Sequence, residues 1–310
     1  MEHVACDFCG IDAATPVSVL RDPQLDLPGE FTLVRCGRCG LFYLNPRPSW
    51  AELAAHYPAD YEPFAGAVAR PQGGHLAAVI RWIKDYGLRR RCRAIARRRS
   101  GGRLLDVGCA TGAFLDQMRR LSNWAVVGVE PIATAAQLAR RHFGLEVFEG
   151  SLLDAAFPDQ AFDVVTLWDV LEHVPDPQSH LAETYRILRP GGLLVVKAPD
   201  PLSWEAHLFG SYWLGHDAPR HLFGFPRSTL TSQFATVGFR PVESVYLIGG
   251  YYTFLGSLGY WAGAHGRPRI ARVAWRLAHS TAARLASAPL FTLARWLGSG
   301  SSLTYFASKP

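Results

Sequence analysis

"RLLDVGCATGAFLDQM", residues 103–118, runs from an apolar segment through a glycine-containing turn into a helical pattern. Such a turn is typical of nucleotide-binding α/β proteins, because the helix N-terminus and free backbone N–H groups face the ligand. The dinucleotide fingerprint G-x-G-x-x-G needs closer glycines than Gly108 and Gly112 provide. Asp106 stands just before the turn, where a carboxylate suits a cationic ligand end better than a pyrophosphate. The stretch therefore favours a nucleoside ligand that carries positive charge and no phosphate.

Acidic residues also follow the later strands of the pattern. Glu130 ends "WAVVGVE", where a carboxylate can accept hydrogen bonds from both ribose hydroxyls. Asp154 precedes "FDVV" and could accept from an adenine amino group, and Trp168-Asp169 ends the strand that follows. These residues predict a nucleoside site at the carboxyl ends of the strands.

Strands and helices alternate after residue 100, which predicts a parallel sheet with helices on both faces. The candidate strands are 103–107, 124–130, 145–148, 162–168 and 192–198, and the helical patterns are 112–121, 132–143 and 177–189. A helix near 228–237, a strand near 240–248, a helical pair at about 250–298 and a last strand in "LTYFASKP" follow.

The motifs "DVGCATG", "VE", "FDVV…DVLEHVPDP" and "LRPGG" together resemble the class I S-adenosylmethionine-dependent methyltransferases over roughly 100–248. The resemblance implies a Rossmann-like α/β fold with a seven-stranded sheet whose last strand is antiparallel. It places Asp106 and the turn at the methionine moiety, Glu130 at the ribose and Asp154 at the adenine. The family norm has glycine where this chain has Ala110. The cofactor-binding residues expected in this way are Asp106, Gly108, Cys109, Ala110, Gly112, Glu130, Pro131, Asp154, Trp168 and Asp169.

Four of the six cysteines form two C-x-x-C pairs, Cys6/Cys9 and Cys36/Cys39. Two short chelating loops suit one tetrahedral zinc ion, and four thiolates make the zinc structural. Two disulfides are the alternative, but the start of the chain shows no secretory signal to support them. The segment also resembles the zinc-binding segment before some methyltransferases, including sugar C-methyltransferases. Their large C-terminal domain has no counterpart in this sequence, so the substrate class stays open.

The expected organisation has three parts. Residues 1–45 form a zinc ribbon, and 46–100 form a linker with amphipathic helices. Residues 101–310 form the methyltransferase domain, with a lid at 200–227 and a helical insertion at 249–300 before the last strand. Cys92 and Cys109 have no paired partner and are expected to be buried packing residues.

Methyl transfer requires an aligned acceptor and, for a hydroxyl or an acidic carbon, removal of a proton. His216 and His221 lie in "FGSYWLGHDAPRHLFGFPRSTL", residues 209–230, at the ligand-binding edge of the sheet. We expect one of them to be the base and favour His221, since the adjacent Arg220 could hold an anionic substrate group. The alternative is a surface loop whose histidines only cap or pack.

"DVLEHV" places Asp169, Glu172 and His173 on one face if the segment is helical. Similar patterns bind a divalent metal in some relatives, whereas in many others the segment only closes the cofactor pocket. Both interpretations remain open.

Positive charge is concentrated in "RRRCRAIARRR", residues 89–99, within a chain of net charge +6. The run is either a solvated helix face beside a stripe of Leu88, Cys92 and Ile95, or a surface for an anionic partner. The insertion at 249–300 is more apolar than a strand connection requires, and Pro289 is expected to kink it. It either extends the core or an oligomer interface, or it contacts a membrane or a lipid-linked acceptor. No secretory signal precedes these features, so we expect a cytoplasmic protein, with peripheral membrane association as an option.

We therefore expect a methyltransferase for a small-molecule acceptor of the sugar, lipid-linked or secondary-metabolite type, acting on oxygen or carbon. Nucleic acid is disfavoured, because the usual amino-methylating signature after the fourth strand is replaced by "WDVLEH". The rival classes are an NAD-dependent oxidoreductase and a non-catalytic cofactor-binding or zinc-mediated scaffold.

Overall fold

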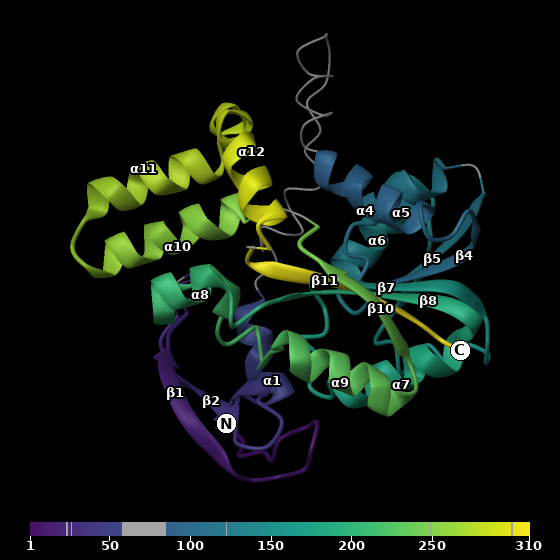
Figure 1. Cartoon of the computed structure of the whole chain (residues 1–310), viewed down its shortest axis with the longest axis horizontal. Helices are drawn as coiled ribbons and strands as arrows, with labels where there is room; N and C mark the ends of the chain where they lie inside the picture. Colours follow the sequence, from purple (N-terminus) through teal and green to yellow (C-terminus); the bar gives the residue numbers. More distant parts are fainter. Residues whose placement is uncertain (23, 26, 58–84, 122, 248–249, 299) are drawn as a thin grey trace.

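The computed structural model describes residues 1–22, 24–25, 27–57, 85–121, 123–247, 250–298 and 300–310. Its centre is a seven-stranded sheet in the order β10-β11-β8-β7-β4-β5-β6 (Figure 1). Strand β11 runs antiparallel to β8 and β10, while β4 runs parallel to both β5 and β7. The expected Rossmann-like sheet with an antiparallel last strand is confirmed. Its strands are β4 (Gly102–Val107), β5 (Trp124–Glu130), β6 (Glu146–Glu149), β7 (Phe162–Trp168), β8 (Leu188–Pro199), β10 (Arg240–Val245) and β11 (Ser302–Ser308).

Helices cover both faces of the sheet, because each presents one apolar stripe to it. One face carries α4 (Tyr86–Ala96), α5 (Ala113–Arg119) and α6 (Ala133–Phe143), and the other carries α7 (Pro177–Ile187) and α9 (Arg227–Val237) (Figure 1). Cys92 and Ile95 of α4 are buried as the stripe predicted, and so is Cys109. The basic run is not only a solvated face. Arg91 lies 4.7 Å over the Trp168 ring, and Arg98 lies 3.7 Å over that of Phe306.

The N-terminal module forms a second sheet that borrows a strand from the lid. Strands β1 (Ala14–Leu20), β2 (Phe31–Cys36) and β3 (Phe42–Leu44) pair in sequence, and β9 (Phe223–Gly224) adds to β3. One apolar cluster runs from the module into the main sheet and includes Leu44, Phe225 and Val196, all nearly inaccessible. The ribbon expected at 1–45 is therefore packed against the rest of the chain.

A short helix follows the module, within the linker expected at 46–100. Ser49 Oγ and Glu52 form a capping box, with the Glu52 carboxylate accepting from the Ser49 N–H at 2.8 Å. The helix α1 (Trp50–Leu53) then tightens into η1 (Ala54–His56). Of the linker expected at 46–100, residues 58–84 lie outside the described residues.

The segment after β10 holds three helices rather than the expected pair: α10 (Tyr251–Ala264), α11 (Pro268–Ala278) and α12 (Thr281–Trp296). Gly266, with φ of 68°, and Pro268 end α10 and start α11. Ser280 then caps α12 by accepting from the Ala283 N–H at 3.2 Å. These helices project away from the main sheet beside the lid, which contains α8 (Trp204–Phe209), η2 (Gly210–Tyr212) and η3 (Leu214–His216) (Figure 1).

Candidate active site

The turn after β4 is built from backbone in the left-handed region. Gly108 has φ of 68° and Gly112 has φ of 81°, and a Cβ on Gly108 would lie 2.6 Å from Val170 Cγ2. The N–H groups of Gly108 and Cys109 donate to the Val129 carbonyl at 2.8 and 3.0 Å. Glycine is therefore required at 108 both by conformation and by space.

Ala110 also has a positive φ, 48°, although it is not glycine. Its N–H donates to Glu130 Oε2 at 2.8 Å, and Glu130 Oε1 accepts from the Ile132 N–H at 2.9 Å. The Glu130 carboxylate thus ties the turn after β4 to the end of β5. This tie explains how the chain holds alanine where the family pattern has glycine.

Both expected acids at the turn are buried. Asp106 Oδ1 accepts from the Thr166 hydroxyl at 2.5 Å, and burial raises the pKa of Asp106 to about 7. Burial also raises the pKa of Glu130. A cation brought to this turn would favour the charged form of Asp106, since an opposite charge lowers the pKa of a carboxyl group.

The remaining cofactor positions surround the turn at different depths. Asp154 is exposed and accepts from the Ser151 N–H at 3.3 Å, and Pro131 is exposed as well. Cys109 is buried against Gly128, where an added Cβ would lie 2.5 Å from its Sγ. Trp168, at the end of β7, is 7% exposed.

Asp169 is held by two cations. It forms ion pairs with Lys197 and, at 3.6 Å, with Arg91. Burial acts to raise the pKa of Asp169, but the charges of Lys197 and Arg91 outweigh it, so its pKa is lowered. Asp169 is therefore a carboxylate with fixed partners at the carboxyl end of the sheet.

Three ligand-type side chains meet just after β7. One ligand atom each of Glu172, His173 and His221 lies within 4.8 Å of the others. The two imidazole rings pack edge to face with centroids 4.5 Å apart. The lid is fastened here, because the N–H groups of Leu222 and Phe223 donate to the Glu172 carbonyl at 2.8 and 3.3 Å.

Hydrogen bonds fix the protonation of both rings. His221 Nδ1 lies 2.8 Å from the Gly215 carbonyl, which can only accept, so Nδ1 carries the proton and Nε2 keeps its lone pair. His173 Nδ1 lies 3.1 Å from the Arg220 carbonyl and 2.9 Å from the Tyr57 hydroxyl. Burial lowers the pKa of His173 to about 3 and also lowers that of His221. Both rings are therefore neutral at physiological pH, and the unprotonated nitrogen of His221, Nε2, lies 4.0 Å from Asp217 Oδ2.

Glu172 is fully buried, and neither of its carboxylate oxygens has a hydrogen-bond partner among the described residues. Burial, together with the charge of Asp169, raises the pKa of Glu172 well above its usual value. The expected helical face of Asp169, Glu172 and His173 does not form, because residues 171–173 are a turn. His221 takes the place of Asp169 in the cluster.

His216 lies outside this cluster. Its ring packs on Trp213 with centroids 5.0 Å apart, and burial lowers its pKa to about 4.

The expectation that Arg220 holds a substrate anion is wrong, because its guanidinium is fully buried and already paired. It contacts Asp22 at 2.8 and 2.9 Å and Asp217 at 2.6 and 3.1 Å. His56 Nδ1 lies 3.0 Å from Asp22 Oδ2. Burial acts to raise the pKa of Asp22, but Arg220 and His56 lower it overall. The network therefore joins the N-terminal module to the lid.

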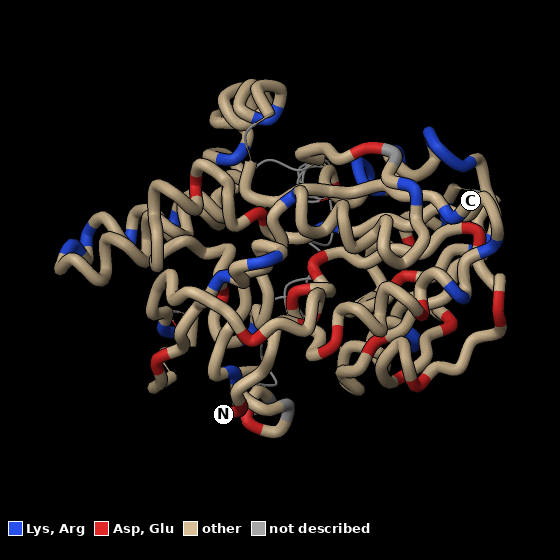
Figure 2. The backbone as a smooth tube through the Cα atoms, turned by 60° about the horizontal axis from the view of Figure 1, so that its bottom comes forward, with Lys and Arg blue, Asp and Glu red and all other residues tan. Residues whose placement is uncertain are grey.

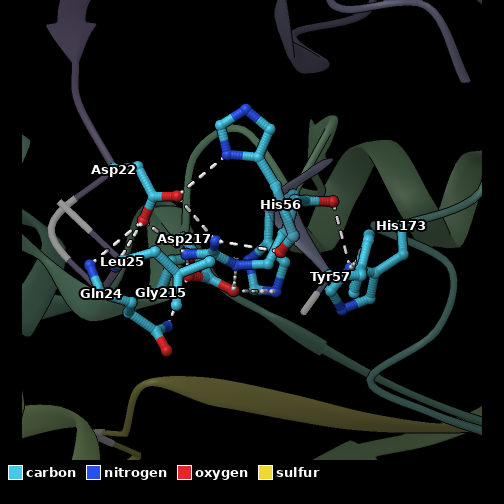
Figure 3. Close-up of polar contacts among 10 residues, drawn as sticks. Asp22, Gln24, Leu25, His56, Tyr57, His173, Gly215 and Asp217 are labelled. Atoms are coloured by element: carbon cyan, nitrogen blue, oxygen red, sulfur yellow. Dashed lines mark hydrogen bonds and ion pairs between the residues drawn. The ribbon is translucent and has the colours of Figure 1, made fainter. Parts of the chain in front are cut away.

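Asp22 and His56 were not predicted as site residues. Asp22 follows β1 and contacts Arg220 of the lid, and His56 ends η1 and bonds Asp22 (Figure 3). The sequence offered one signal, an acid two residues after the apolar strand that ends at Leu20, and this signal does not identify the partner.

The four paired cysteines converge as two similar loops. The N–H of Gly10 donates to the Cys6 carbonyl at 2.8 Å, and that of Gly40 donates to the Cys36 carbonyl at 3.1 Å. The Sγ atoms of Cys6 and Cys39 are 3.4 Å apart, and those of Cys9 and Cys36 are 3.5 Å apart. Zn–S bonds of about 2.3 Å in a tetrahedron imply sulfur separations of about 3.8 Å. The four thiols fit one metal ion, and none forms a disulfide.

Among the described residues, no helix is both long and apolar enough to cross a membrane. Curated relatives match part of the chain. A ubiquinone biosynthesis O-methyltransferase of Pseudomonas putida is 39% identical over 138 residues, which are 41% of this chain and 58% of the relative. A probable S-adenosylmethionine-dependent methyltransferase of Mycolicibacterium smegmatis is 28% identical over 160 residues, which are 50% of this chain and 59% of the relative. The chain thus spans less than three fifths of these relatives.

Solved structures share the fold at low identity. A Thermotoga maritima S-adenosylmethionine-dependent methyltransferase, described as a possible histamine N-methyltransferase, has a TM-score of 0.50 at 19% identity and covers 76% of this chain and 96% of its own. An Archaeoglobus fulgidus methyltransferase has a TM-score of 0.50 at 18% identity, with 73% and 94% covered. The family model described as "Methyltransferase domain" matches residues 80–244, more than half of the chain. With its sheet order, the chain belongs to the class I S-adenosylmethionine-dependent methyltransferases.

Proposed function

We propose that this enzyme transfers the methyl group of S-adenosylmethionine to a hydroxyl or acidic carbon of a small acceptor, with His221 as the general base. The observation that carries the proposal is the His221 tautomer. Its Nδ1–H is bound to the Gly215 carbonyl at 2.8 Å, which leaves Nε2 as the basic nitrogen, and the residue belongs to the cluster at the end of β7. In an open α/β sheet, ligands bind at this edge.

The proposed methyl transfer needs only the acceptor, S-adenosylmethionine and a proton acceptor. The acceptor oxygen or carbon attacks the methyl carbon in line, the carbon–sulfur bond breaks, and S-adenosylhomocysteine leaves. His221 Nε2 takes the acceptor proton and releases it to solvent. Some matched relatives are named O-methyltransferases, which supports oxygen as the methylated atom.

For the cofactor we propose that Asp106 and the Gly108–Gly112 turn face the methionine end. Glu130 accepts from the ribose hydroxyls, and Asp154 accepts from the adenine amino group. The positive φ angles of the turn and its bond to Glu130 support this assignment. The other residues proposed to line the site are Cys109, Ala110, Pro131, Trp168 and Asp169.

We also propose that Cys6, Cys9, Cys36 and Cys39 bind one structural Zn²⁺ ion. The sulfur separations and the two similar loops support it, and four thiolates leave no open coordination position.

A test identifies the product and the base together. The protein is incubated with deuterated-methyl S-adenosylmethionine and fractionated cell extracts, and labelled products are identified by mass spectrometry. His221→Ala should lower turnover about 10²- to 10⁴-fold and leave cofactor affinity nearly unchanged. His207→Ala is a matched control, because its Nδ1 also bonds a carbonyl, Ser203 O at 2.8 Å, outside the cluster. Normal turnover by His221→Ala would remove the base assignment. If no product is labelled while the cofactor binds, the scaffold alternative gains support.

A divalent cation on Glu172, His173 and His221 is a second candidate chemistry, favoured by the unpartnered Glu172 carboxylate. Dialysis against EDTA under conditions that retain the zinc distinguishes the divalent cation from the metal-free histidine base. Turnover that survives supports a metal-free base, whereas turnover that is lost and restored by Mg²⁺ supports the cation.

A further inference from the structure

The helices α11 and α12 leave a broad apolar surface uncovered. No residue of the 16-residue helix α12 is buried. Its large exposed side chains are Leu285 at 49%, Leu290 at 65%, Leu293 at 53% and Trp296 at 77%, and Leu297 just beyond is 75% exposed. At 100° per residue they share an arc of about 140° on one side. Phe291, on another side, packs on Tyr251 with ring centroids 5.5 Å apart.

The helix α11 repeats the arrangement with charge beside it. Ala274 and Ala278 are buried toward the neighbouring helices, whereas Ile270, Val273 and Leu277 are 42%, 53% and 40% exposed. By helical spacing these three side chains form one stripe, and the arginines of the helix lie along one edge of that stripe. The arginines are Arg269, Arg272 and Arg276, all exposed.

The charge of the insertion has a single sign. Residues 249–300 contain six arginines and no aspartate or glutamate. Figure 2 shows blue segments, and no red, at the far tip where α10 turns into α11. An apolar stripe bordered by arginine is the pattern of a helix that lies in a membrane interface, with guanidinium groups at the headgroups.

We propose that the outer faces of α11 and α12 dock on an anionic lipid bilayer. A second copy of this chain fits the surface less well. A two-fold interface brings the same patch together from both copies, so the α11 arginines would face like charges with no carboxylate from the insertion between them. Anionic headgroups neutralise the same arginines and leave the apolar stripe to the acyl boundary.

The docked helices connect directly to the lid. Ser257 Oγ of α10 accepts from the Leu214 N–H at 2.9 Å, and α10 packs on α11 through Gly259, where an added Cβ would lie 2.7 Å from Trp275 Nε1. Leu214 begins η3, which leads to His216 and His221. Bilayer docking thus places the lid beside the lipid. If the proposed function holds, on which this step rests, the acceptor is an apolar molecule carried in the bilayer.

Vesicle co-sedimentation of the full chain tests the surface without any turnover. The protein should sediment with vesicles of phosphatidylcholine plus phosphatidylglycerol at low salt, and much less with phosphatidylcholine alone. The triple variant Leu290→Ser, Leu293→Ser, Trp296→Ser should weaken binding at least about tenfold. Val17→Ser, Val19→Ser is the control, since these residues are 51% and 53% exposed on β1. Arg272→Gln and Arg276→Gln should each weaken binding about fivefold and reduce the preference for anionic lipid.

Two results overturn the proposal. In the first, the protein stays in the supernatant with anionic vesicles at low salt. In the second, analytical ultracentrifugation shows a dimer that the triple variant abolishes while vesicle binding is unaffected. Cofactor affinity and thermal melting of each variant confirm that it is folded. Because binding is measured alone, failure of the surface leaves the methyl-transfer proposal intact, and the reverse also holds.

Discussion

The two sides of the candidate site are built in opposite ways. The proposed cofactor side is a backbone turn from one short stretch, residues 106–112, held by the Val129 carbonyl and the Glu130 carboxylate of the neighbouring strand. The acceptor side is an assembly of side chains from three distant segments, with Tyr57, His173 and His221 in contact. The first depends on conformations that glycine adopts freely, and the second depends on packing between the N-terminal module and the lid.

This difference predicts that the two sides respond separately to damage. A turn within a parallel sheet keeps its shape as long as the sheet is folded. The acceptor side also needs the buried Arg220 network, which joins residues 198 positions apart in the chain. A substitution on the cofactor side should therefore change the acceptor side much less, and the reverse should hold for a substitution on the acceptor side.

The largest effect is expected from loss of zinc. Cys36→Ser, Cys39→Ser should reduce the metal content from about one zinc per chain to none and unfold the ribbon, because metal binding supplies folding free energy in small zinc modules. Turnover should be lost, whereas cofactor affinity should change less than about threefold. Elemental analysis and calorimetric titration measure the two quantities. Cys92→Ala is the control, since this buried cysteine lies on α4 away from the cluster.

If the zinc-site variant lost cofactor binding as completely as it lost turnover, the cofactor side and the acceptor side would depend on the same folded structure. Freshly purified protein without metal, or with a disulfide by mass, would remove the zinc proposal itself.

The second largest effect is expected from replacing Arg220, the buried cation that joins the N-terminal module to the lid. Arg220→Met leaves Asp22 and Asp217 buried without their partner and should destabilise the protein by about 3–5 kcal/mol. Chemical denaturation measures it. Arg21→Met is the control, because its pair with Glu30 is exposed and should change stability little. A change in Arg220→Met as small as in the control would mean that the network does not couple the module to the lid.

At the cofactor turn, Gly108→Val should weaken S-adenosylmethionine binding at least about 100-fold. It forces a β-branched residue to φ of 68° and a Cβ to within 2.6 Å of Val170. Gly144→Val is matched in strain, since its φ is 61°, but nothing lies within 4 Å of an added Cβ. It should be destabilised without losing the cofactor. A folded Gly108→Val protein with normal cofactor affinity would contradict the assignment of the turn.

The smallest effect is expected in the pH dependence of stability. The pKa of Asp22 is lowered in the folded protein, so its pairing contributes stability above the unfolded pKa of about 3.9 and loses it as pH falls through the folded value. In Arg220→Met the buried carboxyl prefers to be protonated. The stability difference between wild type and Arg220→Met should therefore narrow as pH falls below about 5, in denaturation series at several pH values. A constant difference would show that charge pairing is not its cause.

The cofactor side could be predicted from sequence because its signal is local. "DVGCATG" contains the acid and both glycines within one turn, and the strand patterns place Glu130 beside it. The acceptor side was found only in part. The lid histidines stand out as residue types, but the pairing of Arg220 with Asp22 depends on packing between segments far apart in the chain. The third helix of the insertion was missed because a two-residue connection at 279–280 hardly interrupts the apolar pattern.

Strand β9, which completes the N-terminal sheet, is made much later than the strand it pairs with. Synthesis proceeds from the N-terminus, so Phe42 and Tyr43 leave the ribosome long before Phe223 and Gly224, their partners in β9. The cysteine loops can gather at once, because all four lie within the first 39 residues. The edge of β3 and the carboxylate of Asp22 stay uncovered until the lid arrives. The N-terminal module is thus completed only after residues 223–224, nearly two hundred positions later in the chain, have been made.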